Sequence, residues 1–196
     1  MARDLGPLVR TGVTIYHHHW PQLAPNPVRL QVRTVGYEGA DYLGPWQARI
    51  EQACAARGLR FLALAEVKMF NDWSDAKAAE AEALMKIAVA AGAEAISLIP
   101  RNDNVATDRA DSRRVTETAL REILPMLKAH GLKAMVEPLG FAVCSLRYKD
   151  VLADAIDAVG GVGTYFMVHD TFHHALAGFG PIFPELTGIV HVSGVK

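Results

Sequence analysis

The chain has 196 residues, of which 51% are hydrophobic and 21% are charged, and its formal net charge is -1. This length and composition suit one globular domain rather than a disordered chain, and the near-zero charge gives no general electrostatic attraction to nucleic acid or to an anionic membrane. The sequence shows no signal peptide, no apolar run of the roughly 18 residues that span a membrane, and no CxxC pair. We therefore expect a single domain over residues 1–196 in the cytoplasm.

Strand-like apolar runs recur along the chain, and segments with helical character separate most of them. The expected strands are residues 13–16, 30–35, 59–67, 93–100, 132–139, 162–170 and 188–195. Several of these runs are almost continuously apolar, which is typical of strands that are covered on both faces. The expected helices are residues 45–57, 74–91, 112–130 and 148–159.

The ends of these helices carry recognisable signals. Ser74 is a candidate N-cap, while Gly92 and Gly131 follow the ends of two helical patterns. Pro125 lies inside the third helical pattern, where proline can kink a helix. Alternation of strands and helices predicts a parallel sheet with right-handed crossovers.

Seven strand candidates favour a barrel over a five-stranded open sheet. A complete eight-fold barrel typically needs about 250 residues, and this sequence stops just after its seventh strand-like run. The segment between the first two runs is also short and rich in proline. We therefore predict an α/β fold of the (β/α)8 TIM-barrel type, incomplete, with about seven strands and the eighth either missing or not represented.

Three late segments each end an apolar run with a residue type that binds metals. They are LKAMVEPLGF with Glu137, TYFMVHDTFHH with Asp170, and GIVHVSGV with His191. The carboxyl ends of barrel strands meet at one face, so two carboxylates and an imidazole there would form a divalent-metal site. His173 would face the same region if a helix begins after Asp170. The alternatives are a Glu137 bonded to a rim loop, an Asp170 that only caps a helix, and a His191 in the core.

Other histidines are less clear from the sequence. His169 alternates with Asp170 along the strand, so it is expected to be a packed or supporting residue on the opposite side, and the position of His174 stays open. His17, His18 and His19 are consecutive, so they cannot easily bind one ion together. We expect His17 to reach substrate, with an ordinary polar loop as the alternative.

The segments FNDW and PRND end the third and fourth strand-like runs with residues that suit a polyol or keto-sugar. Asn and Arg side chains there would bond hydroxyl groups and a Trp would stack on a sugar face, whereas turn and capping chemistry is the alternative. The substrate-binding candidates are Glu66, Asn71, Trp73, Asn102 and Arg147. The sequence contains no GxGxxG, GxxxxGK[ST], GxSxG or HExxH pattern.

The motifs VEPLGF, VHDTFHH and HVSGV, in this order, resemble the xylose-isomerase-like TIM-barrel superfamily, in its sugar phosphate isomerase/epimerase and inosose isomerase/dehydratase branch. The resemblance is strongest over residues 59–195. It implies a divalent metal (Mn, Co, Mg or Zn) with Glu137, Asp170 and His191 as ligands, Glu137 also as the catalytic base, and His173 as a catalytic, substrate-contacting residue. The family's fourth ligand, a Glu on an eighth strand, has no counterpart before Lys196.

The resemblance implies a divalent-metal-dependent isomerase or epimerase that acts on a keto-sugar or inosose through an enediolate. A dehydratase on the same substrates and a truncated or engineered non-catalytic barrel are the alternatives. An endonuclease IV-like phosphodiesterase fits less well because the chain lacks a basic stripe. The expected partner is a small sugar or polyol, without nucleic acid or membrane, and an open sheet edge would favour a homo-oligomer.

Overall fold

The computed structural model describes residues 13–16, 30–33 and 62–192. These residues contain seven strands in one sheet, which lie in sequence order and pair in parallel throughout. The strands are β1 (Val13–Tyr16), β2 (Leu30–Arg33), β3 (Ala63–Lys68), β4 (Ala95–Ile99), β5 (Lys133–Val136), β6 (Tyr165–Asp170) and β7 (Thr187–His191). The predicted seven-stranded parallel arrangement is therefore confirmed.

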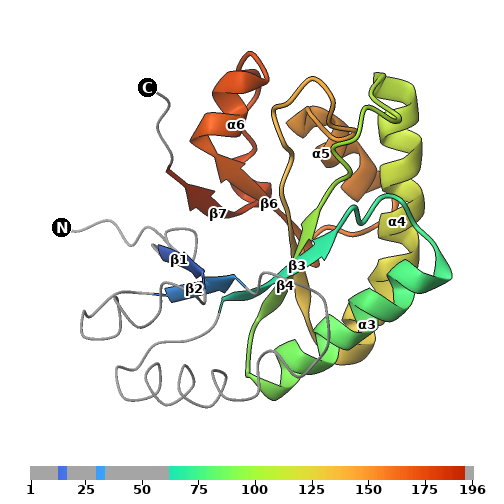
Figure 1. Cartoon of the computed structure of the whole chain (residues 1–196), viewed down its shortest axis with the longest axis vertical. Helices are drawn as coiled ribbons and strands as arrows, with labels where there is room; N and C mark the ends of the chain where they lie inside the picture. Colours follow the sequence, from blue (N-terminus) through green and yellow to red (C-terminus); the bar gives the residue numbers. More distant parts are fainter. Residues whose placement is uncertain (1–12, 17–29, 34–61, 193–196) are drawn as a thin grey trace.

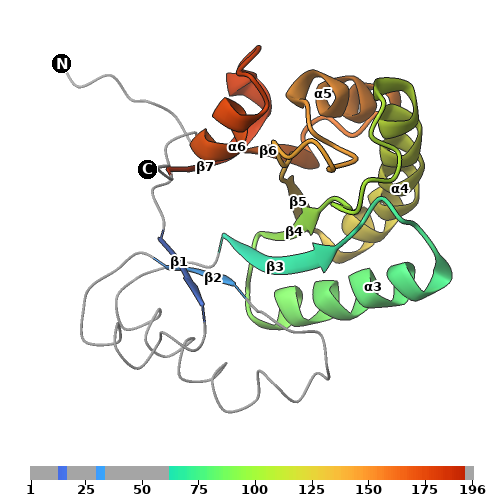
Figure 2. The same cartoon turned by 45° about the horizontal axis from the view of Figure 1, so that its top comes forward.

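Helices connect the later strands and cover one side of the sheet. They are α3 (Asp75–Ala90), α4 (Arg109–His130), α5 (Lys149–Ala158), the short α6 (Thr171–Leu176) and the 3-10 helix η4 (Pro184–Leu186). Figures 1 and 2 show α3, α4 and α5 side by side along the outer side of β3 to β6, while α6 stands at the end of β6. The sheet curves like the wall of a barrel, and within the described residues no pairing joins β7 to β1.

Local capping explains where the long helices begin and end. The Ser74 Oγ accepts a hydrogen bond from the third residue of its helix, as predicted. The helix α4 begins at Arg109, three residues before the predicted start at Ser112, because Asp108 is the residue that caps it. This helix continues through Pro125 and ends at Gly131, whose φ of 66° places it in the left-handed region.

The predicted helix over residues 45–57 and the three consecutive histidines lie outside the described residues. The predicted helix over 148–159 agrees with α5 to within one residue at each end. Cys144, which lies within the described residues, is buried and is not in a disulfide.

Alternate strand residues belong to two separate apolar clusters, so residues on both faces of the sheet are buried. The outer cluster joins the sheet to the helices and includes Leu64, Ile96, Leu98, Leu120, Leu152 and Met167. The inner cluster consists of Ala63, Ala95, Met135, Val168 and Ile189, all from strands. A Cβ on Gly188 would lie 2.6 Å from the Met135 Sδ, so the glycine leaves the room that this side chain fills.

Candidate metal centre

The three predicted metal ligands follow the inner cluster along their strands. Glu137, Asp170 and His191 each come two residues after a member of that cluster. Successive strand residues point to opposite faces, so a residue two positions further on points the same way. Their side chains therefore lie at the carboxyl end of the inner face, where the sequence predicted them.

The carboxylates and the imidazole are in direct contact. The His191 Nδ1 lies 3.3 Å from the Glu137 Oε1 and 3.9 Å from the Asp170 Oδ2. The Glu137 and Asp170 residues are only 5% and 8% exposed. Without an ion, the His191 Nδ1–H donates to the Glu137 carboxylate; a bound ion would take the place of this hydrogen, and the neutral ring would then carry its hydrogen on Nε2.

The Asp170 carboxylate serves two purposes at once. Its Oδ1 accepts hydrogen bonds from the backbone N–H groups of Phe172 at 2.7 Å and His173 at 3.0 Å, and so caps α6. Its Oδ2 faces His191. Helix capping, the alternative to a metal ligand, is therefore present, but it uses one oxygen and leaves the other directed at the centre.

His173 adjoins the same centre from the first turn of α6. One ligand atom each from Glu137, Asp170 and His173 lie within 4.8 Å of one another. The His173 Nδ1 accepts a hydrogen bond of 3.3 Å from the backbone N–H of Gly140. A neutral ring that accepts at Nδ1 carries its hydrogen on Nε2, so this imidazole presents a donor rather than a ligand nitrogen.

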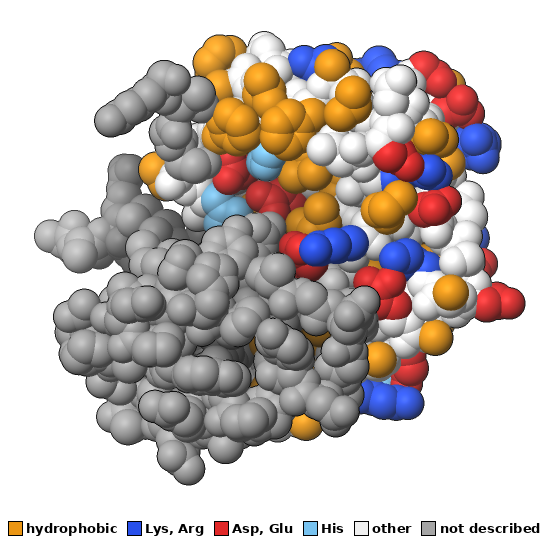
Figure 3. All heavy atoms as spheres, in the orientation of Figure 1, with side chains coloured by type: hydrophobic (Ala, Val, Ile, Leu, Met, Phe, Trp, Pro, Cys, Tyr) orange, Lys and Arg blue, Asp and Glu red, His pale blue; other side chains and the backbone are white. Residues whose placement is uncertain are grey.

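The donor set suits a divalent metal ion. Two carboxylates and an imidazole are ligands of Zn²⁺ and Mn²⁺, and ligands about 2.1 Å from one ion are themselves separated by roughly 3.0–3.4 Å. The 3.3 Å between His191 and Glu137 meets this requirement, and the 3.9 Å to Asp170 needs only a small side-chain adjustment. Figure 3 shows acidic and histidine side chains together on this face, bordered by hydrophobic side chains.

The structure gives Asn71 and Glu66 contacts within the protein. The Asn71 Nδ2 donates to the Ser145 Oγ at 2.7 Å, and its Oδ1 accepts from the Arg101 N–H at 2.9 Å. These bonds tie together the loops that follow β3, β4 and β5. Glu66 is buried, with its Oε1 3.7 Å from the Lys68 Nζ. Substrate binding by either residue stays a prediction.

The other substrate candidates are spread more widely. Trp73 is half-buried and packs against the outer cluster, while Asn102 is exposed. The Arg147 Nη2 donates to the Leu176 carbonyl at 3.0 Å, and its guanidinium lies over the Tyr148 ring. His17 lies outside the described residues. None of these four side chains has a described contact with Glu137, Asp170 or His191, so their roles also stay predictions.

Sequence reasoning missed the contact in which the Gly140 N–H donates to the His173 Nδ1. The two residues are 33 positions apart, and a Cβ on Gly140 would lie 2.2 Å from the His173 carbonyl oxygen. The Gly that follows Glu-Pro-Leu was the available signal, because glycine marks places where two backbone segments approach closely.

Comparisons with known proteins agree with this architecture. A family model described as xylose isomerase-like TIM barrel matches residues 13–196. A search of curated proteins finds no significant match. Within the described residues, no helix is both long and apolar enough to cross a membrane.

Several solved structures share the fold at low sequence identity. A xylose isomerase domain-containing protein from Salmonella typhimurium LT2 is 22% identical, with a TM-score of 0.75, over 93% of this chain and 71% of that chain. The IolI protein with a bound zinc atom is 14% identical, with a TM-score of 0.78, over 93% and 72%. The 3-keto-D-glucoside 4-epimerase YcjR from E. coli is 11% identical, with a TM-score of 0.71, over 93% and 78%. The chain belongs to the xylose isomerase-like TIM barrel family.

Proposed function

We propose that this protein is a divalent-metal-dependent isomerase or epimerase that acts on a keto-sugar or inosose through an enediolate. The observation that carries the proposal is the convergence of Glu137, Asp170 and His191 at the ends of three successive strands. The epimerases among the solved structures, which include a D-allulose 3-epimerase from Methylomonas sp., support the choice of substrate class. The zinc atom of the IolI structure supports the choice of a metal site.

In this proposal, Glu137, Asp170 and His191 hold the metal ion. When bound, the ion supplies a Lewis acid that polarises a substrate carbonyl and lowers the free energy needed to remove the neighbouring proton. The three residues are held before binding, because the Asp170 cap and the His191–Glu137 contact already direct them to one point.

The protein groups then move the proton and stabilise the charge. The Glu137 carboxylate accepts the proton from the carbon next to the carbonyl, as a general base. The His173 Nε2–H donates to a substrate oxygen on which negative charge develops, and the Gly140 N–H holds that ring in the required tautomer. Delivery of a proton to the other carbon of the enediolate gives an isomer, and delivery to the opposite face of the same carbon gives an epimer, whereas loss of a β-hydroxyl gives the product of a dehydratase.

The test is exchange of the substrate α-proton in deuterated water, followed by NMR, with D-allulose and an inosose as probes. Glu137→Gln should reduce exchange by roughly 10²–10⁴-fold, the usual contribution of a general base. Glu122→Gln, on the exposed side of α4, is the matched control and should leave exchange unchanged. Exchange at the wild-type rate in Glu137→Gln would contradict the base role, and water loss would identify a dehydratase.

A further inference from the structure

A second cluster of titratable side chains lies on the outer side of β6. Lys149, the first residue of α5, is only 8% exposed. Its Nζ lies 2.7 Å from the His169 Nδ1 and 3.2 Å from the His174 Nδ1, and the two imidazole centroids are 4.9 Å apart. The proposed isomerase chemistry uses none of these three groups.

The proton positions in this cluster follow from the donors available. An ammonium group can only donate, so both Nδ1 atoms accept from Lys149 and both neutral rings carry their hydrogen on Nε2. Burial and the neighbouring ammonium lower the pKa of His174, which favours its neutral form. Each ring therefore presents a lone pair to the lysine nitrogen.

The lysine has no close counter-ion in the described part of the chain. No described carboxylate lies within 4.0 Å of its Nζ; Asp170 acts on it only at longer range, and the neighbouring Asp150 is paired with Arg109. Desolvation by burial lowers the pKa of Lys149 to about 8. Its position at the N-terminus of a helix also favours the neutral amine, because the helix dipole is positive there.

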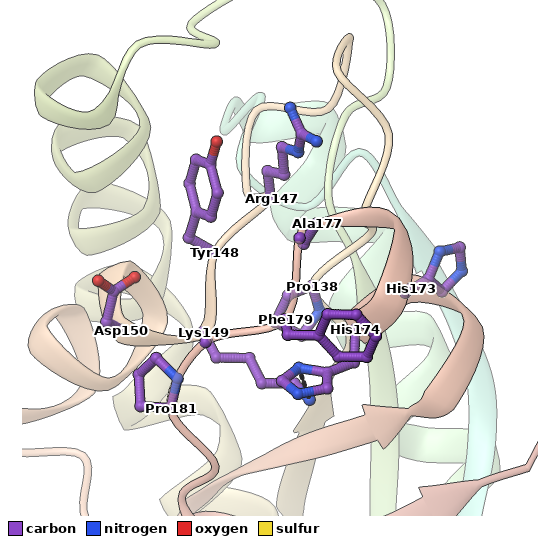
Figure 4. A pocket seen from close by; sticks show the side chains of 12 residues that line it. Pro138, Arg147, Tyr148, Lys149, Asp150, His173, His174, Ala177, Phe179 and Pro181 are labelled. Carbon is purple, nitrogen blue, oxygen red and sulfur yellow. Dashed lines mark hydrogen bonds between the residues drawn. The ribbon is translucent and has the colours of Figure 1, made fainter.

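A pocket of about 240 Å³ opens beside this amine. Its lining includes Arg147, Lys149, His174 and Phe179, together with His173 and the Asp150 carboxylate, which is paired with Arg109. Figure 4 shows the Lys149 side chain running toward His174 beneath Phe179, whereas the His173 ring points away from both. The pocket therefore adjoins the proposed metal centre at His173, whereas the Lys149 amine lies on the outer side of β6.

The pocket also contains a cation that suits an anionic ligand. The Arg147 Nε is buried without a hydrogen-bond partner, and no described carboxylate lies within 4.0 Å of this guanidinium. Its Nη2 is anchored by the Leu176 carbonyl. The Arg147 guanidinium, which has no described carboxylate partner, and the Lys149 amine both line this pocket. They fit a molecule with a carboxylate or phosphate at one end.

We infer that Lys149 is a nucleophilic amine that forms an imine with a small carbonyl compound bearing an anionic group, bound in this pocket. The neutral nitrogen attacks the carbonyl carbon, a C–N bond forms, and the carbonyl oxygen gains a proton. The second amine proton then leaves with that oxygen as water, which gives the C=N bond. His174, which already accepts from Nζ, receives the amine protons in turn and passes them to the departing oxygen.

The inference is tested on the wild-type protein with glyoxylate and sodium cyanoborohydride near neutral pH, and the adducts are mapped by mass spectrometry. Lys86, whose side chain is 68% exposed, is the internal control. Because a pKa near 8 leaves far more neutral amine than an ordinary lysine pKa, Lys149 should be modified more than about tenfold faster than Lys86. Modification of Lys149 at the rate of Lys86 or slower would overturn the inference and leave the lysine as a structural contact between β6 and α6.

Two variants separate the parts of the inference. Arg147→Met should slow modification of Lys149 by glyoxylate but not by the uncharged propionaldehyde; equal effects on both would overturn the anionic class. Glu122→Gln, on the exposed side of α4 and outside the pocket lining, should leave modification unchanged. The modification needs neither a metal ion nor an isomerase substrate, so either proposal can fail alone.

Discussion

The proposed inner metal centre and the outer lysine cluster share two segments of chain, the end of β6 and the first turn of α6. Asp170 and His173 face the inner centre, while their neighbours His169 and His174 face Lys149 on the outside. The inner centre contains two carboxylates, so its charge attracts a cation. The outer cluster contains imidazoles around an ammonium, so its cation is already a part of the protein. Adjacent residues of the chain therefore face two sites with different chemistry.

This comparison implies that the two groups share a scaffold and differ in chemistry. The end of β6 and the first turn of α6 position both, through the Asp170 cap. A change in one side chain should affect one group, whereas a change in the shared backbone should affect both. The predictions below use this distinction.

The largest effect is expected at Asp170, where metal binding and helix capping can be separated. Asp170→Asn keeps an oxygen that caps α6 but removes the charge, so Mn²⁺ affinity should fall by more than about 100-fold with little change in stability. Asp170→Ala should lose the same affinity and also about 1 kcal/mol of the free energy of unfolding. Titration calorimetry and urea unfolding measure the two quantities. An Asn variant with wild-type affinity would refute the ligand role.

The next effect concerns the pH dependence of stability, through Lys149. Its pKa is lowered on folding, so between about pH 8 and the ordinary lysine pKa the unfolded chain binds more protons than the folded chain. The free energy of unfolding of the wild type should therefore rise across this window relative to Lys149→Met, by at most about 3 kcal/mol. Urea unfolding at a series of pH values provides the comparison. Parallel curves for the two proteins would show that the lysine is not desolvated.

A smaller effect is expected at Gly140, which contacts the shared scaffold. A Cβ there would lie 2.2 Å from the His173 carbonyl oxygen and 2.9 Å from the Leu176 Cβ. Gly140→Ala should therefore cost about 1–3 kcal/mol of stability and weaken both Mn²⁺ binding and the selective modification of Lys149. Gly92→Ala, where φ is +67° but a Cβ would meet nothing within 4 Å, is the control because it lies outside the pocket lining. It should lower the free energy of unfolding without changing Mn²⁺ binding or the modification of Lys149. Equal losses in both variants would show that Gly140 does not position the two groups.

The strands could be predicted from the sequence because most described strand residues are buried, which makes the strands continuous apolar runs. The first residue of α4 could not be predicted from the sequence. Asp108, Asp111 and Ser112 are all good N-cap residues, and only the fold selects Asp108. Asn71 shows the same limit: its residue type suits both substrate binding and loop contacts, and its partners are 30 and 74 positions away.

The inner centre was accessible to sequence reasoning because strand alternation alone places Asp170 and His169 on opposite sides. The structure bears out that separation through the contact of His169 with Lys149. Lys149 was missed because its partners depend on how α5 and α6 pack beside β6. A weak signal existed, since a lysine at the first position of a helix opposes the helix dipole.

The central claim is that the inner residues, and not their outer neighbours, hold a divalent metal. Mn²⁺ binding measured by calorimetry in the wild type, His191→Ala and His169→Ala tests it most directly. We predict one ion per chain in the wild type, a loss of more than about 100-fold in affinity for His191→Ala, and less than about tenfold for His169→Ala. Absence of binding in the wild type, or equal losses in the two variants, would contradict the claim.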